Sequence, residues 1–323
     1  ATAYQRDLQT GRLEHWSIGV QRQLGDSRTI DIAYVGSRGR NLIAARDINQ
    51  PDPSPVARNL RPNPLFDDIT LIESRGKSVY NAMQIKFQQR FDRGLTVLTA
   101  YTLGNSNDDA SGFFASAGDP NFPQDSRNPG LEYGRSSFDV RHRFSTGFGW
   151  EIPLGTGQRW LENKGTLSTI LADWELQGIV TLQSGQPFTV ALLPEVDNSN
   201  TGRSTLGFGA NDRPNLVGNP VLANPSPEQW FNTSAFTVPP FGSFGDAGRN
   251  ILDGPDFQNV NLALTKDVSV REGVTLQLRA ETFNLFNRTN FNLPDAFVGS
   301  PTFGQIVSTE SPRRCQFGIK LIF

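Results

Sequence analysis

The sequence predicts an all-β fold, part of an antiparallel transmembrane β-barrel, and three observations support this prediction. Nine segments of about ten residues alternate apolar with polar side chains, which matches the length and the period of a strand that crosses a bilayer. Short turns and long polar connections separate these segments. No run approaches the roughly 18 apolar residues that a membrane helix requires.

The composition is compatible with such a fold. The chain has 323 residues, of which 37% are hydrophobic, and its mean hydropathy is −0.40. These values would suit a water-soluble domain. In a transmembrane strand, however, only every second residue meets lipid, so a barrel is polar on average.

The first four expected strands form two hairpins. Leu13–Gln23 and Arg28–Val35 are joined by Leu24–Ser27, and Val79–Gln89 and Leu95–Leu103 are joined by a turn at Asp92–Gly94. In the first three of these strands, one face carries large apolar side chains: Trp16, Ile18, Val20, Ile30, Ile32, Tyr34, Val79, Met83, Ile85 and Phe87.

Five further strands are expected at Phe138–Trp150, Trp174–Leu182, Val260–Leu264, Val274–Ala280 and Gln316–Phe323. Phe138–Trp150 alternates most clearly, with aromatic and aliphatic residues on one face and charged or small residues on the other. The polar faces of the nine strands should line the inside of the barrel. The charged residues expected there are Lys86, Asp139, Arg141, Arg143, Glu175, Arg279 and Glu281.

The connections predict the topology. Short turns are expected after the first, third, fifth and seventh strands, and long segments rich in Pro and Gly after the second, fourth, sixth and eighth. Outer-membrane barrels have short periplasmic turns and long extracellular loops. This asymmetry places the C-terminus in the periplasm. Tyr34 and Tyr101 then fall at loop-side ends, and Trp150, Trp174 and Phe323 at turn-side ends, as in aromatic girdles.

Nine strands cannot close a barrel, because single-chain bacterial barrels use even strand numbers and an open edge in lipid leaves backbone groups unpaired. We therefore expect residues 1–323 to be the C-terminal part of a larger barrel. Ala1 is not an initiator residue, and no basic and apolar signal segment precedes it. A removed signal or a fragment would explain this start.

Charge and composition argue against several other functions. A net charge of −2 gives no electrostatic case for nucleic acid. The single Cys excludes an internal disulfide, and the two distant His make a zinc site improbable. Gly155-Thr156-Gly157 lacks the Lys-Ser/Thr of a phosphate loop, and there is no Gly-x-Ser-x-Gly elbow. We expect no enzyme, no cofactor and no catalytic residues.

The last eight residues resemble the assembly signal of bacterial outer-membrane barrels. Gln316, Gly318, Leu321 and Phe323 carry this resemblance, and the chain stops on an aromatic residue at the end of an alternating strand. Exposed termini of soluble proteins are usually polar unless something ties them down. The resemblance implies recognition by the barrel assembly machinery.

Several longer motifs resemble the C-terminal barrel of Oar-like TonB-dependent receptors. They are Tyr34–Gly39, Phe138–Phe144, Ser184–Phe188, Asn211–Asn215 and above all Ala280–Phe291. The resemblance runs from about residue 10 to the last residue. It implies a 22-stranded barrel closed by a plug domain and energised through a TonB box. The plug domain, the TonB box and the N-terminal barrel strands lie outside this sequence.

The resemblance therefore implies a TonB-dependent receptor or transporter of the cell outer membrane, which takes up an unidentified extracellular ligand. Its expected partners are outer-membrane lipid, the assembly machinery and the TonB complex through the absent N-terminal region. The alternative is a non-transporting surface protein, an adhesin or an assembly scaffold, on the same barrel. A plug with a TonB box upstream would discriminate the two. A soluble all-β binding module is a third hypothesis, which would leave the terminal Phe a coincidence.

Other chemical signals have ordinary structural explanations. Charged residues in a barrel usually pair across strands or with a plug. The stretches Asn105–Asp109 and Asp197–Asn200 offer oxygen ligands but lack the spacing and the closing Glu of a calcium loop. His142 and Cys315 are expected on the lipid-facing side. We predict no metal site.

The longest connection, residues 184–255, carries the candidate ligand contacts. They are Arg203, Arg213, Trp230, Phe231, Phe236 and Arg249, which offer anion contacts and stacking surfaces. The loop aromatics Phe113, Phe114, Trp230, Phe231, Phe236, Phe241 and Phe244 are costly to leave in water. They either pack the loops into a cap or stack on a ligand, and packing is the safer interpretation.

Overall fold

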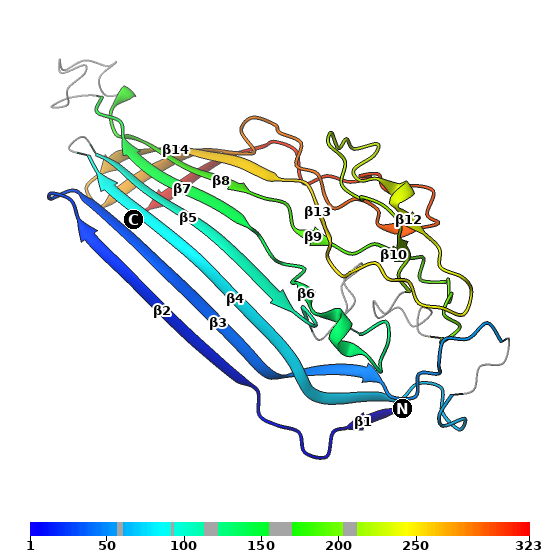
Figure 1. The fold of residues 1–323 in the computed structure, drawn as a ribbon. Helices are drawn as coiled ribbons and strands as arrows, with labels where there is room; N and C mark the ends of the chain where they lie inside the picture. The colour runs from blue at the N-terminus through cyan, green and yellow to red at the C-terminus, as the bar shows by residue number, and fades with distance from the viewer. Residues whose placement is uncertain (57–60, 92–93, 113–121, 155–169, 203–211) are drawn as a thin grey trace.

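One curved antiparallel sheet forms the length of the molecule, and the long connections gather at one end of it (Figure 1). The computed structural model describes residues 1–56, 61–91, 94–112, 122–154, 170–202 and 212–323. No helix in these ranges is long and apolar enough to cross a membrane.

Nine long strands follow one another across this sheet in the order β17-β15-β14-β8-β7-β5-β4-β3-β2, with β17 and β2 at opposite edges. Every neighbouring pair is antiparallel. Each strand corresponds to one predicted segment, so the all-β prediction and the strand count are confirmed. The strands are β2 (Arg12–Gln23), β3 (Arg28–Asp47), β4 (Thr70–Arg90), β5 (Leu95–Asp108), β7 (His142–Glu151), β8 (Trp174–Gln183), β14 (Phe257–Arg271), β15 (Val274–Phe283) and β17 (Arg314–Ile322).

The ends of β3, β4 and β5 extend beyond the predicted segments. β3 and β4 continue to pair as far as Asp47 and Thr70, but their register shifts between Gly39 and Ala44. Asn41, inside this irregularity, has a φ of 54°, a conformation that Asn tolerates better than most residues. The bulge lets the hairpin continue past the regular sheet because it absorbs the mismatch locally.

β7 begins four residues later than predicted. The sequence indicated a strand from Phe138, whereas the structure places residues 138–141 outside any strand, with a turn at residues 137–138. The reason is Asp139, which is buried and accepts hydrogen bonds from the Ser106 N–H (2.7 Å) and from Arg135 Nε (3.0 Å). The carboxylate thereby accepts the hydrogen bond of a β5 backbone N–H group that would otherwise be made to a neighbouring strand.

The turn end of the sheet contains the connections 24–27 and 272–273, in which Gly25 and Gly273 adopt positive φ values of 70° and 74°. Glycine suits these positions because it lacks a Cβ. The connection from β7 to β8, residues 152–173, is longer than the short turn that we predicted there. Residues 155–169 of it, which include Gly155–Gly157, lie outside the described residues.

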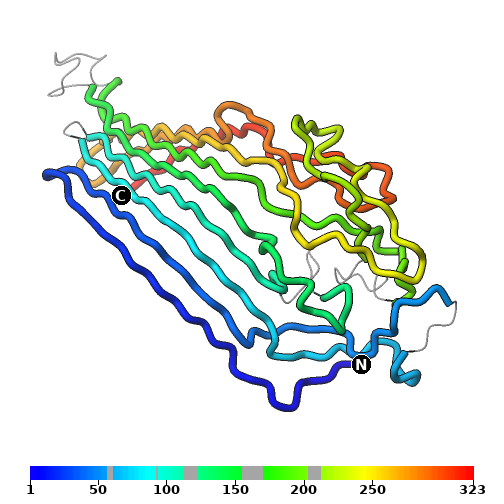
Figure 2. The backbone as a smooth tube through the Cα atoms, viewed as in Figure 1, coloured from blue at the N-terminus to red at the C-terminus, as the bar shows by residue number. Residues whose placement is uncertain are grey.

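Short elements join the loops at the other end. β9 (Pro187–Phe188) pairs with β13 (Leu252–Asp253), β10 (Ala191–Leu192) with β16 (Phe297–Val298), and β11 (Asn215–Leu216) with β12 (Phe236–Thr237). The 3₁₀-helix η3 (Thr233–Ala235) lies between β11 and β12, and η1 (Pro129–Glu132) lies in the connection between β5 and β6. β6 (Gly134–Arg135) extends the pairing of β5, and β1 (Thr2–Tyr4) runs parallel to β4. The tube view shows these loops beside the far ends of the strands (Figure 2).

Candidate functional site

The two faces of the sheet differ in chemistry, and the strand register decides which residue lies on which face. On one face Ile18 is paired with Tyr34, Tyr34 with Met83 and Met83 with Leu103. The register of the other strands places Leu278 and Ile319 on the same face. We call this the apolar face. His142 and Cys315 lie on it, as predicted, through their pairing with Leu103 and Thr282.

Aromatic residues mark both ends of the apolar face. At the loop-side end, the Tyr34 hydroxyl donates to Asn81 Oδ1 (2.6 Å), and the Tyr101 hydroxyl lies 2.8 Å from His142 Nδ1. At the turn-side end, Lys266 Nζ lies 5.5 Å from the centre of the Trp174 ring. Aromatic rings with a polar edge are typical of a boundary between lipid and water.

The opposite, polar face carries the charged residues that we predicted for the inside of a barrel. Lys86, Arg143, Glu175, Arg279 and Glu281 lie on it, according to the register. Arg279 Nη2 and Glu281 Oε1 are 2.8 Å apart on the same strand. Asp139 and Arg141, by contrast, precede β7 and are not part of its alternation.

A cavity opens on the polar face beside the loops. It has a volume of about 430 Å³ and is lined in part by Tyr80, Gln84, Thr102, Phe138 and Arg143. Phe138 is 56% exposed, so its ring is available at the rim. The combination of aromatic rings, hydroxyls and a guanidinium can hold a ligand that has both polar and apolar parts.

The loops form a folded unit with an apolar core. We call the described parts of residues 48–69, 109–141, 184–256 and 284–313 the loop cap. Phe231 is 1% exposed and lies at the centre of its core. The Phe231 ring centre is 5.6 Å from Phe188, 5.8 Å from Phe236 and 5.3 Å from Phe303. Phe231 and Phe236 therefore pack the loops together, as the safer of the two interpretations predicted.

Two buried ion pairs connect the loop of residues 184–256 to the end of β5 and to the loop that follows β5. Arg249 Nη2 lies 2.7 Å from Asp108 Oδ1, and the same guanidinium donates to the Glu132 carbonyl oxygen (3.1 Å). Arg213 Nη2 lies 2.8 Å from Glu132 Oε1. Each buried charge has an opposite charge beside it, because an unpaired ion in this environment would be strongly destabilising.

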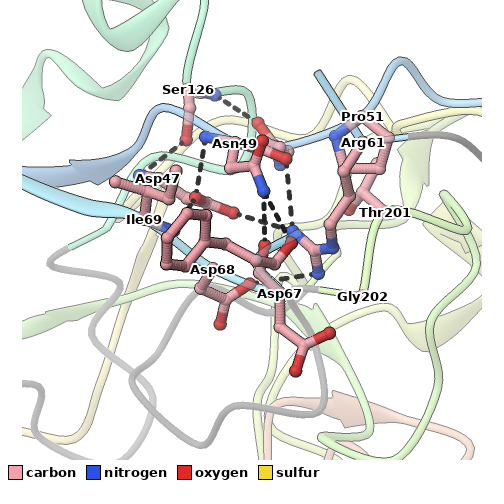
Figure 3. Close-up of polar contacts among 12 residues, drawn as sticks. Asp47, Asn49, Pro51, Arg61, Asp67, Asp68, Ile69, Ser126, Thr201 and Gly202 are labelled. Atoms are coloured by element: carbon pink, nitrogen blue, oxygen red, sulfur yellow. Dashed lines mark hydrogen bonds and ion pairs between the residues drawn. The ribbon is translucent and has the colours of Figure 1, made fainter. Parts of the chain in front are cut away.

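A third cluster ties the loop after β3 to its neighbours (Figure 3). Arg61 contacts the Asp47 carboxylate (3.3 Å) and the Asp68 carboxylate (3.0 Å). Asn49 Nδ2 donates to the carbonyl oxygens of Asn63, Phe66 and Asp67. These backbone carbonyl groups of the loop thus have hydrogen-bond donors, although no strand pairs with them.

Asp212 is a buried carboxylate in the same cap. The pKa of Asp212 is raised to about 6, mainly by burial and to a smaller extent by the charge of Asp197, while hydrogen bonds from Ser199 and Asn198 act in the opposite direction. The Ser199 N–H donates to Asp212 Oδ2 at 2.6 Å. This group therefore changes charge within a range of pH that cells encounter.

The candidate ligand contacts are distributed unevenly. Arg213, Phe231, Phe236 and Arg249 are buried, and their contacts described above are internal to the cap. Trp230 is half-buried, and its Nε1 donates to the Asp253 carbonyl oxygen (2.9 Å). Arg203, Phe113 and Phe114 lie outside the described residues. A ligand contact by any of the six candidates stays a prediction.

The oxygen-rich loop stretches are also used internally. Asp108 and Asp109 face Arg249 and Arg75, while Asp197 accepts hydrogen bonds from the backbone N–H groups of Thr201 and Gly202. Within the described ranges, no group of three or more His, Cys, Asp or Glu side chains could hold a metal ion.

The assembly-signal residues lie at the sheet edge. Gln316 pairs with Glu281, Gly318 with Arg279, and Leu321 with Leu276. Phe323 follows the last strand residue and is 96% exposed. The arrangement leaves the apolar end of this edge strand accessible, while its role as an assembly signal stays a prediction.

Sequence reasoning missed the polar connections between loops. Gln124, for example, accepts a hydrogen bond from the Arg213 N–H (2.6 Å) and donates to the Gly245 carbonyl oxygen (3.0 Å). Nothing in a local pattern distinguishes such a Gln from a surface residue. The role of Gln124 is recognisable only when the three-dimensional structure brings segments far apart in the chain together.

Comparisons with known proteins agree with this architecture. A family model described as an outer membrane beta barrel domain matches residues 1–316. A search of the curated proteins gives no match.

Among solved structures, the chain is similar to the outer membrane transporter YddB from Escherichia coli, with a TM-score of 0.52 and 10% identity over 99% of this chain and 34% of that one. It is also similar to the pyoverdine outer membrane receptor FpvA from Pseudomonas aeruginosa, with a TM-score of 0.47 and 12% identity over 98% and 30% of the two chains. The chain thus spans about a third of the length of the YddB transporter.

Proposed function

Because the chain belongs to the outer membrane beta barrel domain family and lies in the outer membrane, we propose that it is the C-terminal part of a TonB-dependent receptor that imports an extracellular ligand. The missing part would supply the remaining strands, the plug and the TonB box. The observation that supports this proposal best is the combination of an apolar outer face, a polar inner face and a folded loop cap over one end. Similarity to an outer membrane transporter adds support at the level of fold.

In this proposal the ligand meets the loop cap first and then the polar-face cavity beside Tyr80 and Arg143. Binding by exposed or half-buried cap residues such as Trp230 is compatible with the folded core. Phe231 and Arg249 would act indirectly, by holding the loops in place. Passage through the barrel would require the plug to move, which is why we propose energised uptake rather than diffusion.

Uptake can be tested without knowing the ligand. Cells with the intact receptor and cells that lack it would be grown in a complex medium, and mass spectrometry would follow the depletion of compounds too large for porins. Receptor-dependent depletion that stops with a protonophore is expected. Depletion that continues would indicate a passive pore. If nothing is depleted but the cells still adhere to a surface through the receptor, the adhesin alternative is favoured.

The same proposal places the loop cap outside the cell. Single cysteines would be introduced at the exposed positions Ser234, in the cap, and Asp26, in a turn, after the exposed Cys315 is replaced by Ser. An impermeant thiol reagent applied to whole cells should label S234C but not D26C. The opposite labelling would invert the proposed topology.

We further propose that the barrel assembly machinery recognises the C-terminal strand. The double substitution of Leu321 and Phe323 by Ser should lower the amount of folded receptor in the outer membrane, because it removes the apolar end of that strand. The polar-face change Lys320→Ser is a matched control. Equal amounts of heat-modifiable barrel in all variants would show that the terminal residues are not an assembly signal.

A further inference from the structure

Four basic residues lie on the same side of the sheet as the apolar residues, at the loop-side end of β2 and at the same level of β3 and β4. The register pairs Arg12 with Arg40 and Glu14 with Arg38, and pairs Arg38 with Val79 of β4. Lys77 is two residues from Val79 and therefore lies on the same face. We call Arg12, Arg38, Arg40 and Lys77 the basic patch; all four are exposed.

The basic patch begins where the apolar face ends. On β2, Trp16 is the next residue on this face after Glu14, followed by Ile18 and Val20. The Trp16 ring covers Gly36 of β3 so closely that a Cβ on Gly36 would lie 2.3 Å from it. On β3, Tyr34 continues the aromatic boundary. The four cations therefore lie just beyond the edge of the apolar face, at the depth of lipid headgroups.

The charge in this region is predominantly positive. Glu14 lies on the same face, and its Oε2 lies 3.8 Å from Arg40 Nη2. Beside Lys77, the Asp109 carboxylate accepts a hydrogen bond from the Lys77 N–H (2.8 Å) and lies 3.5 Å from Arg75 Nη1. Within the described part of the chain, Arg12, Arg38 and Lys77 have no carboxylate within ion-pair distance. Exposed cations that are not neutralised by neighbours attract anions, and guanidinium groups bind phosphate with two parallel hydrogen bonds.

We propose that the basic patch binds the phosphate groups of the phosphorylated glycolipid in the outer leaflet. This inference rests on the proposed orientation, in which the loop end faces outward. A lipid is favoured over a soluble anion because the patch is continuous with the apolar face, so a molecule with acyl chains and a phosphorylated headgroup matches both surfaces. The bound lipid would hold the barrel at a defined depth in the membrane.

The same strands provide a matched control. Arg22 and Arg28 are exposed on the apolar face of β2 and β3, beyond its turn-side end. They have the same charge and the same outward direction as Arg12 and Arg38, but they lie at the opposite membrane boundary. Any general effect of lost positive charge would appear in both pairs.

The test uses the intact receptor, solubilised in a neutral detergent. Native mass spectrometry would measure binding of bisphosphorylated lipid A, of dephosphorylated lipid A and of phosphatidylglycerol. The wild type should prefer the bisphosphorylated form. R12Q/R38Q should weaken that binding by about fivefold for each removed charge, whereas R22Q/R28Q should leave it unchanged.

A second variant keeps the proposal testable if R12Q/R38Q does not fold. Glu14→Gln removes the carboxylate beside Arg40, so it should strengthen binding of the bisphosphorylated lipid. Heat-modifiable mobility on a gel would establish folding in every case. Equal losses in both double variants, an unchanged affinity in R12Q/R38Q and E14Q, or a loss confined to phosphatidylglycerol would each overturn the proposal.

Discussion

The strand region and the loop cap place their apolar side chains in opposite environments. In the strands, Ile18, Phe317 and Ile319 are 73%, 82% and 76% exposed, and they lie on the same face of the sheet, on its two edge strands β2 and β17. In the cap, Val190 and Phe231 are 0% and 1% exposed. The strands bury nothing against a second layer, so lipid must cover their apolar face. The cap is surrounded by water and needs its own core.

Charged residues show the same difference. Arg279 and Glu281 form a pair on the polar face with side chains 48% and 19% exposed, whereas the Arg249 and Asp108 side chains are only 1% and 3% exposed. The two pairs have similar N–O distances of 2.8 and 2.7 Å. Their contributions to stability should nevertheless differ, because the surroundings decide what a lost partner costs.

The largest expected effect is in the cap. Arg249→Ala should destabilise it by about 3 to 5 kcal/mol, because Asp108 would remain buried without its partner. Hydrogen exchange of the backbone amides in residues 212–256 of the intact receptor would measure the change. The double variant D108N/R249M should restore much of the protection. If single and double variants exchange as slowly as the wild type, the pair does not hold the loops together.

A pH-dependent effect is expected at Asp212, whose pKa is about 6 in the folded cap against an ordinary value of 3.8. A carboxyl with a raised pKa stabilises the fold fully below pH 3.8, and this contribution is lost as the pH rises through about 6. Asp212→Asn should therefore stabilise the cap at pH 8 by about 3 kcal/mol, since one pKa unit corresponds to about 1.4 kcal/mol.

The difference between Asp212→Asn and the wild type should shrink toward zero near pH 4. Hydrogen exchange of residues 212–217 at several pH values would follow it. Glu195→Gln, in which an exposed carboxylate of the same loop is changed, provides a comparison for general charge effects. A constant difference across the pH range would mean that the Asp212 carboxyl does not titrate near pH 6.

The facing of the strands can be tested at two adjacent positions of β15. Leu278 lies on the apolar face, so Leu278→Arg should cost about 2 to 4 kcal/mol of folding free energy in a bilayer. Gln277 lies on the polar face and donates to Asp267 Oδ1 at 3.0 Å, so Gln277→Arg keeps an acidic neighbour and should cost much less. Equal destabilisation in urea titrations from liposomes would contradict the assignment of the faces.

The smallest effect is expected for Arg279→Gln. Its exposed pair with Glu281 should contribute about 0 to 1 kcal/mol, so the same urea titration should detect little change. A loss as large as that of Arg249→Ala would mean that the polar face is shielded from water in the intact receptor. That result would indicate that another part of the intact receptor covers the polar face at β15, and it would narrow the difference between the strands and the cap.

The sequence by itself determined the strands and their faces. A period of two residues is a local property, so each of the nine segments could be recognised without knowing its neighbours, and the pairing register then confirmed a continuous apolar face. The terminal strand and the turns at Gly25 and Gly273 were predictable for the same reason. The late start of β7 was not, because the Asp139 carboxylate satisfies a backbone group on another strand.

Only the tertiary structure decided which loop residues are buried inside the cap. From sequence, Arg213, Phe231, Phe236 and Arg249 could face a ligand or one another, since loops have no period that separates an inner from an outer side. Their burial depends on contacts such as Arg249 with Asp108, which are 141 residues apart in the chain. Such pairs form when the strand ends bring distant loops together, and no local pattern encodes that proximity.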